Sequence, residues 1–326
     1  MNWKKLSILG VLVMVFVVPP LIWDIGTSVL NLLIMLFIYI ILSQSWNLMG
    51  GYTGQINLGL AAFFGCGTLV THFIWKAGFA FYLAMAAGGV AAMVLAVIIG
   101  LPTLRLKGMY FGIGTFALSE VCRIVVGSTF HRMLKMPSSY IASYSLVSRY
   151  YVAFVVAILA IVVVYLVTHS KLGLGMVAVR DDETAAQVTG VNTFKCKVLA
   201  LFISALLAGL AGGVFAYLRL SFHFIHMMFS PVWTFEPLMA AIIGGAGTLV
   251  GPIIGSVFLV VLSEIFALKL GEAHLIIFGL LFVLVVMYFP YGLVGSVDRI
   301  RQIMRQVGWS VSKAETRAVG RGSEIG

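Results

Sequence analysis

Long apolar runs recur along almost the whole chain, and they limit its fold more than any other feature. A helix that crosses the hydrocarbon core of a bilayer needs about 20 mostly apolar residues. The candidate segments are residues 6–23, 29–46, 58–75, 79–101, 109–127, 150–168, 198–218, 235–247, 251–268 and 273–289. Only 10% of the 326 residues are charged and the mean hydropathy is +1.09, whereas soluble domains carry about 25% charged residues. The sequence therefore predicts an all-α polytopic membrane protein.

The run at residues 235–247 is shorter than the others. At a rise of about 1.5 Å per residue it cannot cross a bilayer as a helix, so it predicts a half-helix or the first part of a broken one. Counting this run as one span gives an expected total of about ten transmembrane segments. The expected range is eight to ten, with some segments broken or re-entrant.

Lysine and arginine near the ends of the apolar runs predict the orientation of the chain. Lys4 and Lys5 place the N-terminus inside, and a basic tail places the C-terminus inside, so the number of crossings is even. Arg105 and the loop at residues 170–197 then also fall inside. The basic segment 128–149 falls outside, which is an exception to the rule.

The charge pattern divides the chain into two parts. Residues 1–298 form the predicted transmembrane domain, in which the loop 170–197 is cytoplasmic, and residues 299–326 form a basic cytoplasmic tail. The net charge of +10 comes from loops and tail, not from a patch interleaved with exposed aromatic residues. We therefore expect the lipid bilayer, and no nucleic acid, as a partner.

The chain lacks the usual signals of catalytic chemistry. Cys66, Cys122 and Cys196 lie far apart without CxxC spacing, so neither a zinc site nor a disulfide framework is predicted. His223 and His226 lie three residues apart without a third ligand, which does not make a metal site. The sequence contains no phosphate-binding loop and no nucleophile with a matching base. We expect no catalytic residue, no metal and no cofactor.

Two glycine clusters interrupt the apolar runs, at residues 50–59 (GGYTGQINLG) and 244–255 (GGAGTLVGPIIG). Glycine inside a helix costs about 1 kcal/mol relative to alanine, and irregular backbone at membrane depth needs protein or a water-filled cavity around it. Close helix packing explains either cluster alone, but two such breaks together favour a path for a solute. The predicted path residues are Gly51, Thr53, Gln55, Asn57, Gly245 and Gly247. Asn47, just before the first break, is expected to hydrogen-bond to freed backbone groups.

Two charges, Glu120 and Arg123, lie inside the apolar run 109–127. Their spacing of three residues puts them on one helix face. Charges within a membrane are rare and tend to pair or to face a cavity. Two interpretations remain open, a gate or solute contact and a mutually satisfied pair near the membrane surface, and the second is slightly favoured.

The cytoplasmic loop carries its own helix signals. Asp181 or Asp182 can cap a short helix that has Glu183 in its first turn, and Gly190 is a good C-terminal stop. The pattern predicts a helix of about two turns on the cytoplasmic face. From spacing alone, an ordinary amphipathic surface helix explains it equally well.

Several of these motifs resemble known sequences. The order Glu183-x-Ala185-Ala186-x-x-x-Gly190 resembles the EAA loop of ABC importer permeases. The segments 173–180 and 190–192 resemble the branched-chain amino-acid permeases more narrowly. The same is true of the segments 50–59, 61–65, 105–111, 204–212 and 244–255. Because they extend over residues 40–290 in a consistent order, the chain resembles the larger permease subunit of that family.

The resemblance implies a function and a set of partners. The chain would be a non-catalytic permease subunit of an ABC importer in the bacterial cytoplasmic membrane, with both termini cytoplasmic. Its partners would be a second homologous permease subunit, two cytoplasmic ATP-binding subunits that hydrolyse ATP, and a periplasmic solute-binding protein. The implied coupling helix to the ATPase comprises Arg180, Asp182, Glu183, Ala185, Ala186 and Gly190.

One departure leaves the solute open. Where the family usually has histidine after the first glycine break, this chain has Leu60. The expected substrates are branched-chain amino acids or a related small amino acid or amide, and urea, a sugar or an aromatic acid are alternatives. An ion-coupled secondary transporter is a further alternative, with Glu120 as its candidate coupling acid.

Overall fold

The computed structural model describes residues 26–106, 108–130, 134–135, 137, 145–219, 221–222, 225–270, 279, 287 and 292–294. The predicted span 6–23 and the tail 299–326 lie outside the described residues, and so does nearly all of the span 273–289. His223 and His226 also have no described side chains.

Long apolar helices dominate the described part of the chain. They include α3 (Thr27–Asn47), α5 (Phe81–Leu95), α7 (Met109–Thr129), α9 (Leu146–Thr168) and α12 (Thr193–Leu218). Two of them continue into π-helical turns, η1 (Leu48–Tyr52) after α3, and η2 (Ala96–Gly100) followed by α6 (Leu101–Thr103) after α5. A shorter apolar helix, α4, covers Leu60–Lys76. Six stretches of the described residues are long and apolar enough to cross a membrane, and the all-α membrane fold is confirmed.

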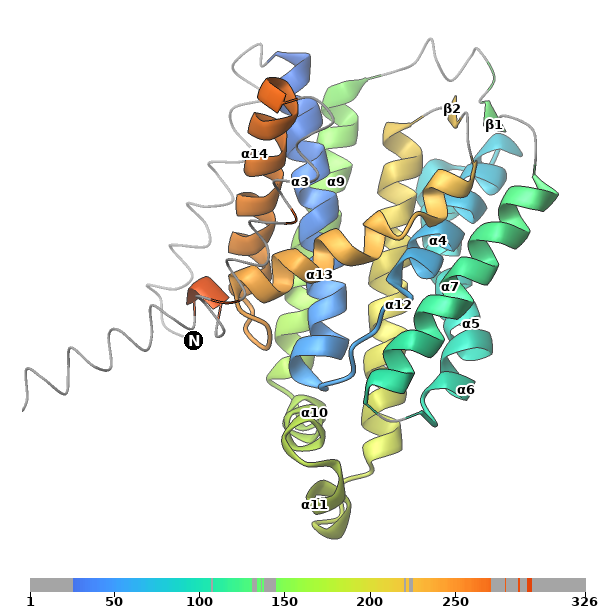
Figure 1. The fold of residues 1–326 in the computed structure, drawn as a ribbon. Helices are drawn as coiled ribbons and strands as arrows, with labels where there is room; N and C mark the ends of the chain where they lie inside the picture. Colours follow the sequence, from blue (N-terminus) through green and yellow to red (C-terminus); the bar gives the residue numbers. More distant parts are fainter. Residues whose placement is uncertain are drawn as a thin grey trace, which may run out of the picture.

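The long apolar helices lie side by side, with two short helices of the loop 170–197 at one end (Figure 1). These are α10 (Lys171–Asp181) and α11 (Glu183–Val188). At the other end, β1 (Leu134–Lys135) pairs with β2 (Ser221–Phe222) in a short antiparallel ladder. Helix α6, which precedes Arg105, lies at the α11 end (Figure 1), consistent with the expectation that Arg105 and the loop 170–197 share one side.

Small residues bring α4, α5 and α12 close together. A Cβ atom at Gly67 would overlap the backbone of Gly209, and one at Gly212 would overlap the carbonyl of Phe64. In lipid, burial of apolar surface does not drive helices together, so close van der Waals packing at small residues holds them instead. These glycines are therefore packing residues within regular helices.

Helices α13 (Val232–Gly244) and α14 (Gly251–Leu270) form a tight hairpin. After the 3₁₀ turn η3 (Ile225–Phe229), α13 slants across α3 and α12, and α14 returns to the end at which β2 lies (Figure 1). The half-helix predicted at residues 235–247 is thus present as α13. The stretch Met227–Gly244, which contains α13, is one of the six candidate spans, and Gly251–Phe266 in α14 is a shorter apolar helix. The expected count of about ten spans is therefore not confirmed among the described residues.

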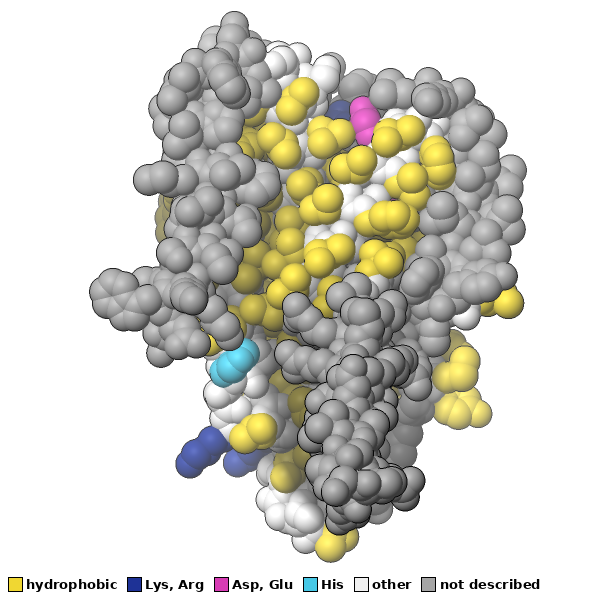
Figure 2. All heavy atoms as spheres, turned by 90° about the vertical axis from the view of Figure 1, so that its left-hand side faces the viewer, with side chains coloured by type: hydrophobic (Ala, Val, Ile, Leu, Met, Phe, Trp, Pro, Cys, Tyr) yellow, Lys and Arg dark blue, Asp and Glu magenta, His cyan; other side chains and the backbone are white. Residues whose placement is uncertain are grey.

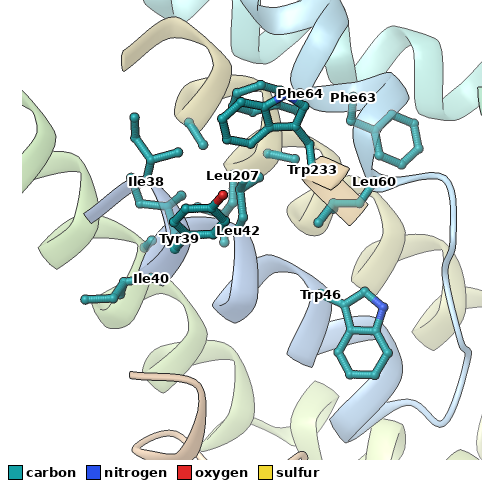
Figure 3. Packing of buried hydrophobic residues seen from close by; sticks show 14 of the residues in the cluster. Ile38, Tyr39, Ile40, Leu42, Trp46, Leu60, Phe63, Phe64, Leu207 and Trp233 are labelled. Atoms are coloured by element: carbon teal, nitrogen blue, oxygen red, sulfur yellow. The ribbon is translucent and has the colours of Figure 1, made fainter. Parts of the chain in front are cut away.

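An aromatic cluster anchors α13 against the bundle (Figure 3). The Trp233 ring stacks on Phe64 at 4.4 Å between centroids and meets Phe215 edge-on at 4.8 Å. Tyr39 stacks on the same indole, and its hydroxyl donates to the Glu236 carboxylate. Aromatic pairs of this kind add about 0.5–1.5 kcal/mol each beyond burial, so the cluster fixes the oblique path of α13.

The face on which α14 lies is covered by apolar side chains (Figure 2). Ile254, Val257, Val261 and Ile265 form an exposed stripe at helical spacing along α14. In a membrane protein, lipid tails or another apolar surface can cover such a stripe, whereas water cannot do so without cost.

Candidate functional site

The first glycine cluster forms a true break between two helices. Helix α3 ends in the π-turn η1, residues 53–59 are non-helical, and α4 begins at Leu60. Gly54 adopts a φ of +72°, a left-handed conformation that favours glycine. Backbone groups freed by the break find partners within it. The Thr53 hydroxyl donates to the Leu48 carbonyl at 2.9 Å, and the backbone N–H of Gln55 donates to the Met49 carbonyl at 2.9 Å.

Two polar side chains of this break are buried with unused hydrogen-bonding capacity. Asn57 is fully buried. Its backbone carbonyl accepts from the Trp46 indole at 2.9 Å, and its side-chain Oδ1 accepts from the backbone N–H of Gly59 at 2.8 Å. Among the described residues, neither Asn57 Nδ2 nor Gln55 Oε1 has a partner. Buried polar atoms are nearly always paired with protein or water, so these two can bind water or a polar solute.

The second glycine cluster forms the turn between α13 and α14. Gly245 and Gly247 have φ values of +124° and +80°, which fits the prediction of an irregular element here. The Thr248 hydroxyl accepts from the Gly251 amide at 3.0 Å and donates to the Gly245 carbonyl at 2.8 Å. These bonds close the turn before α14 begins.

The two breaks meet in space, although about 200 residues separate them. Asn47 joins them, since its Oδ1 accepts from the Gly247 amide at 2.7 Å and its Nδ2 donates to the Thr248 carbonyl at 2.8 Å. Gln44 Nε2 donates to the Leu249 carbonyl at 2.6 Å. A Cβ atom at Gly51 would overlap both the Asn47 side chain and the Gly247 amide. We call this contact between residues 51 and 247 the glycine junction.

The sequence analysis named both breaks but not their meeting. The expectation that Asn47 bonds to freed backbone is confirmed, although the groups lie in the other break. The sequence analysis did not single out Gln44, whose only signal is a polar amide side chain within the largely apolar run 29–46. Polar side chains within membrane segments need partners, and a distant break supplied them here.

A cavity of about 370 Å³ lies beside the same helices, between α3 and α14. Polar side chains that line it are Ser28, Asn31, Tyr39, Ser263 and Glu264. Its size suits a small ligand. The sequence analysis did not predict this cavity, because its walls come from two helices distant in the chain.

The loop at residues 170–197 contains two helices joined at Asp182. Asp182 caps α11, with its Oδ1 accepting from the amides of Thr184 at 2.8 Å and Ala185 at 3.0 Å. These backbone hydrogen bonds, chiefly the one from Ala185, hold the pKa of the Asp182 carboxyl below its usual value. Gly190, at a φ of +89°, ends the turn. The short helix predicted between Asp182 and Gly190 is thus present.

The surface of α11 is divided between inward and outward side chains. Glu183 turns inward and pairs with Lys197 of α12 at 2.7 Å, and Ala186 is buried. Ala185 and Gln187 are exposed, and Val188 is 87% exposed. Single exposed apolar side chains are common on ordinary surfaces, so the exposure of Val188 by itself does not identify a contact surface. Sequence patterning alone had given no special place to Val188 or Lys197.

Arg180 lies at the last turn of α10 and points to the glycine junction. Its Nη1 donates to the Gly51 carbonyl at 3.1 Å, and its Nε and Nη2 donate to Asp181. The structure therefore joins a residue of the loop 170–197 to the first break.

Glu120 and Arg123 form an ion pair on α7, with Arg123 Nη2 at 2.6 Å from Glu120 Oε2. Both side chains are partly exposed. Arg123 satisfies one carboxylate oxygen, whereas Glu120 Oε1 is buried without a hydrogen-bond partner among the described residues, so both interpretations of the pair stay open. Among the described residues, no hydrogen bond or ion pair joins this pair to the glycine junction.

Comparison with known proteins supports a transport role. The profile of a family described as "Branched-chain amino acid transport system / permease component" matches residues 28–286. The chain is 25% identical to the high-affinity branched-chain amino acid transport system permease protein LivM of Escherichia coli, over 89% of this chain and 75% of that protein. It is 26% identical to LivM of Salmonella typhimurium with the same coverage. A probable LivM of Methanocaldococcus jannaschii is 24% identical over 69% of this chain and 71% of its own. No solved structure matches.

Proposed function

The chain belongs to the family of branched-chain amino acid transport system permease components, and we propose that it is the membrane-spanning subunit of an ABC importer. Its solutes would be branched-chain amino acids or a related small amino acid or amide. The relatives named above are permease proteins, so a transport subunit rather than a catalyst is the family-level function. The importing direction and the solute are the proposed part.

The observation that carries the proposal is the glycine junction. Two stretches of irregular backbone meet inside a bundle of apolar helices, with Gln55 Oε1 and Asn57 Nδ2 buried and unpaired among the described residues. Irregular backbone at membrane depth is tolerated where it lines a cavity or is buried in protein. Broken segments of this kind form solute paths in transporters. The path would include Gly51, Thr53, Gln55, Asn57, Gly245 and Gly247.

The second element of the proposal is the coupling surface on α11. Its exposed side chains, Ala185, Gln187 and Val188, would contact one of two cytoplasmic ATP-binding subunits. A second, homologous permease would complete the path, and a periplasmic binding protein would deliver the solute. Arg105 and the basic loop at the α11 end support a cytoplasmic position for that end. The polar cavity between α3 and α14 would then open toward the periplasmic side.

The alternatives differ in what they require. An ion-coupled secondary transporter needs a free acid in the membrane, and Glu120 is held by Arg123. A permease for urea, a sugar or an aromatic acid would keep the same architecture, and Leu60 in place of the usual histidine leaves room for it.

Reconstitution tests the proposal. The complete transporter, with both permeases, the ATP-binding subunits and the binding protein, is placed in liposomes and uptake of labelled leucine is measured with ATP and without it. We expect uptake only with ATP and with the binding protein. Equal uptake by this chain alone, driven by a proton or sodium gradient, would overturn the proposal. Uptake of urea or an aromatic acid in competition with leucine would correct the solute class.

A further inference from the structure

Arg180 belongs to the loop 170–197, but its side chain reaches the first glycine break. It lies in the last turn of α10, two residues before the Asp182 cap of α11. Helix α10 packs against α9, α12 and the π-turn η1. A shift of α11 therefore acts on the end of α10, in addition to its direct contact with α12 through the Glu183–Lys197 pair.

The Arg180 side chain touches both glycine breaks. Its Nη1 donates to the Gly51 carbonyl at 3.1 Å. The same nitrogen lies 2.8 Å from the point that a Cβ atom at Gly247 would occupy, and the Arg180 Cγ lies 2.9 Å from the corresponding point at Gly54. The Arg180 side chain thus occupies the space of the missing side chains in both segments, with its aliphatic stem at Gly54 and its guanidinium at Gly247.

The other edge of the guanidinium is held from the cytoplasmic loop. Arg180 Nη2 lies 3.1 Å from Asp181 Oδ1, and Nε donates to the same oxygen. Arginine suits this place because its planar group offers donors in a fixed fork, so that it can bond in two directions at once. Lysine presents a single charged point and cannot keep both contacts in one geometry.

At the junction itself the two breaks are packed without space for a solute. A Cβ atom at Gly51 would already overlap the Gly247 amide. The contact is consequently the closed arrangement of these two segments, and Arg180 stabilises it by bonding to one break while lying against the other.

We propose that Arg180 is the positioning residue that transmits movement of the α10–α11 segment to the glycine junction. When a partner displaces α11, the end of α10 withdraws the guanidinium from the Gly51 carbonyl, and residues 51 and 247 can separate. The inference rests on the proposed function, because it needs an ATP-binding subunit to move α11. A ligand or partner changes such an equilibrium only by as much as it favours one state.

The expected effect follows from the single bond that is lost. A hydrogen bond to a charged group is worth enough to change a two-state ratio by about tenfold or more. Removing the guanidinium should release the junction from α10. ATP turnover should then continue while much less solute moves for each ATP hydrolysed.

The test uses the complete reconstituted transporter and measures solute moved and ATP hydrolysed in the same vesicles. We expect Arg180→Gln to lower the ratio of solute to ATP about tenfold, with ATP turnover at or above the native rate. Arg180→Lys, which keeps the charge, should fold and lower the ratio by a smaller factor. Lys195→Gln is the matched control, since Lys195 is an exposed cation at the same end of the molecule.

Two results separate this inference from the proposed function. A native solute-to-ATP ratio in both Arg180 variants, with Lys195→Gln also native, would overturn the role of Arg180. The variant Val188→Asp tests the coupling surface independently, because it places a charge on the exposed face of α11. If Val188→Asp leaves co-purification with the ATP-binding subunits unchanged, the proposed surface on α11 is wrong, whatever the Arg180 variants do.

Discussion

The ion pair between Glu183 and Lys197 yields a quantitative prediction, because its two members differ in burial. The Lys197 side chain is 4% exposed and the Glu183 side chain is 31% exposed, with 2.7 Å between Nζ and Oε1. The pair joins the first turn of α11 to the first turns of α12. We therefore expect removal of the acid and removal of the base to have unequal costs.

The loss of stability in each variant depends on which charge of the pair remains and how buried it is. At 2.7 Å two unit charges attract by about 6 kcal/mol at an effective dielectric constant of about 20, and desolvation offsets most of that. Breaking a fully buried pair costs about 3–5 kcal/mol. Glu183→Gln leaves a buried ammonium ion without its counter-charge, so we expect a cost of about 3 kcal/mol. Lys197→Met leaves a carboxylate that water reaches, so we expect about 1 kcal/mol.

The assay is thermal unfolding of the purified protein in detergent, followed by tryptophan fluorescence. The difference of about 2 kcal/mol corresponds to several degrees in Tm, with Glu183→Gln the less stable variant. Exchanging the two residues should recover most of the native Tm, because the pair is restored. If Lys197→Met lowers Tm as much as Glu183→Gln, or more, the assignment of Lys197 as the buried member is refuted.

Three further predictions concern the glycine junction and the cap of α11. Gly51→Ala should lower uptake strongly and cost about 1–3 kcal/mol, because its Cβ overlaps Asn47 and Gly247, whereas Gly26→Ala, with nothing within 4 Å, should leave uptake native. Gln55→Ala should slow uptake at unchanged membrane insertion, as judged by transport kinetics and yield; native kinetics would remove Gln55 from the path. Since the pKa of Asp182 is lowered, its cap is intact above the ordinary value near 3.8 and is lost as pH falls through the lowered value. Amide exchange in residues 184–185 should rise in that acid range, and Asp182→Asn should abolish the pH dependence; an unchanged profile would contradict the cap.

Local signals predicted the local structure of this chain well. Hydropathy found the apolar helices, because a bilayer demands that every spanning backbone group be satisfied within its helix. Capping chemistry placed a short helix between Asp182 and Gly190, since a carboxylate acceptor and a left-handed glycine act within a few residues. Hydropathy and capping residues are both local signals, since each acts over a few helical turns.

Contacts between distant segments could not be predicted in the same way. Nothing in the sequence around Asn47 indicates that its amide bonds to Gly247 and Thr248. The sequence analysis counted the segments of α13 and α14 as separate spans, because an apolar helix that crosses and one that turns back have the same composition. Likewise, the sequence placed Glu183 in the first turn of a short helix, and only the tertiary structure pairs it with Lys197.

The structure separates the two explanations that the sequence left open for glycine. At Gly67 and Gly209 the backbone is regular helix and the missing side chains let two helices touch, which is the packing role. At Gly54 and Gly247 φ is positive, so a side chain would be strained even with free space. That space, moreover, holds Arg180. A glycine that has a positive φ and lies against Arg180 of the loop 170–197 is not explained by helix packing alone. For this reason we propose that the solute path and its control lie at the same junction.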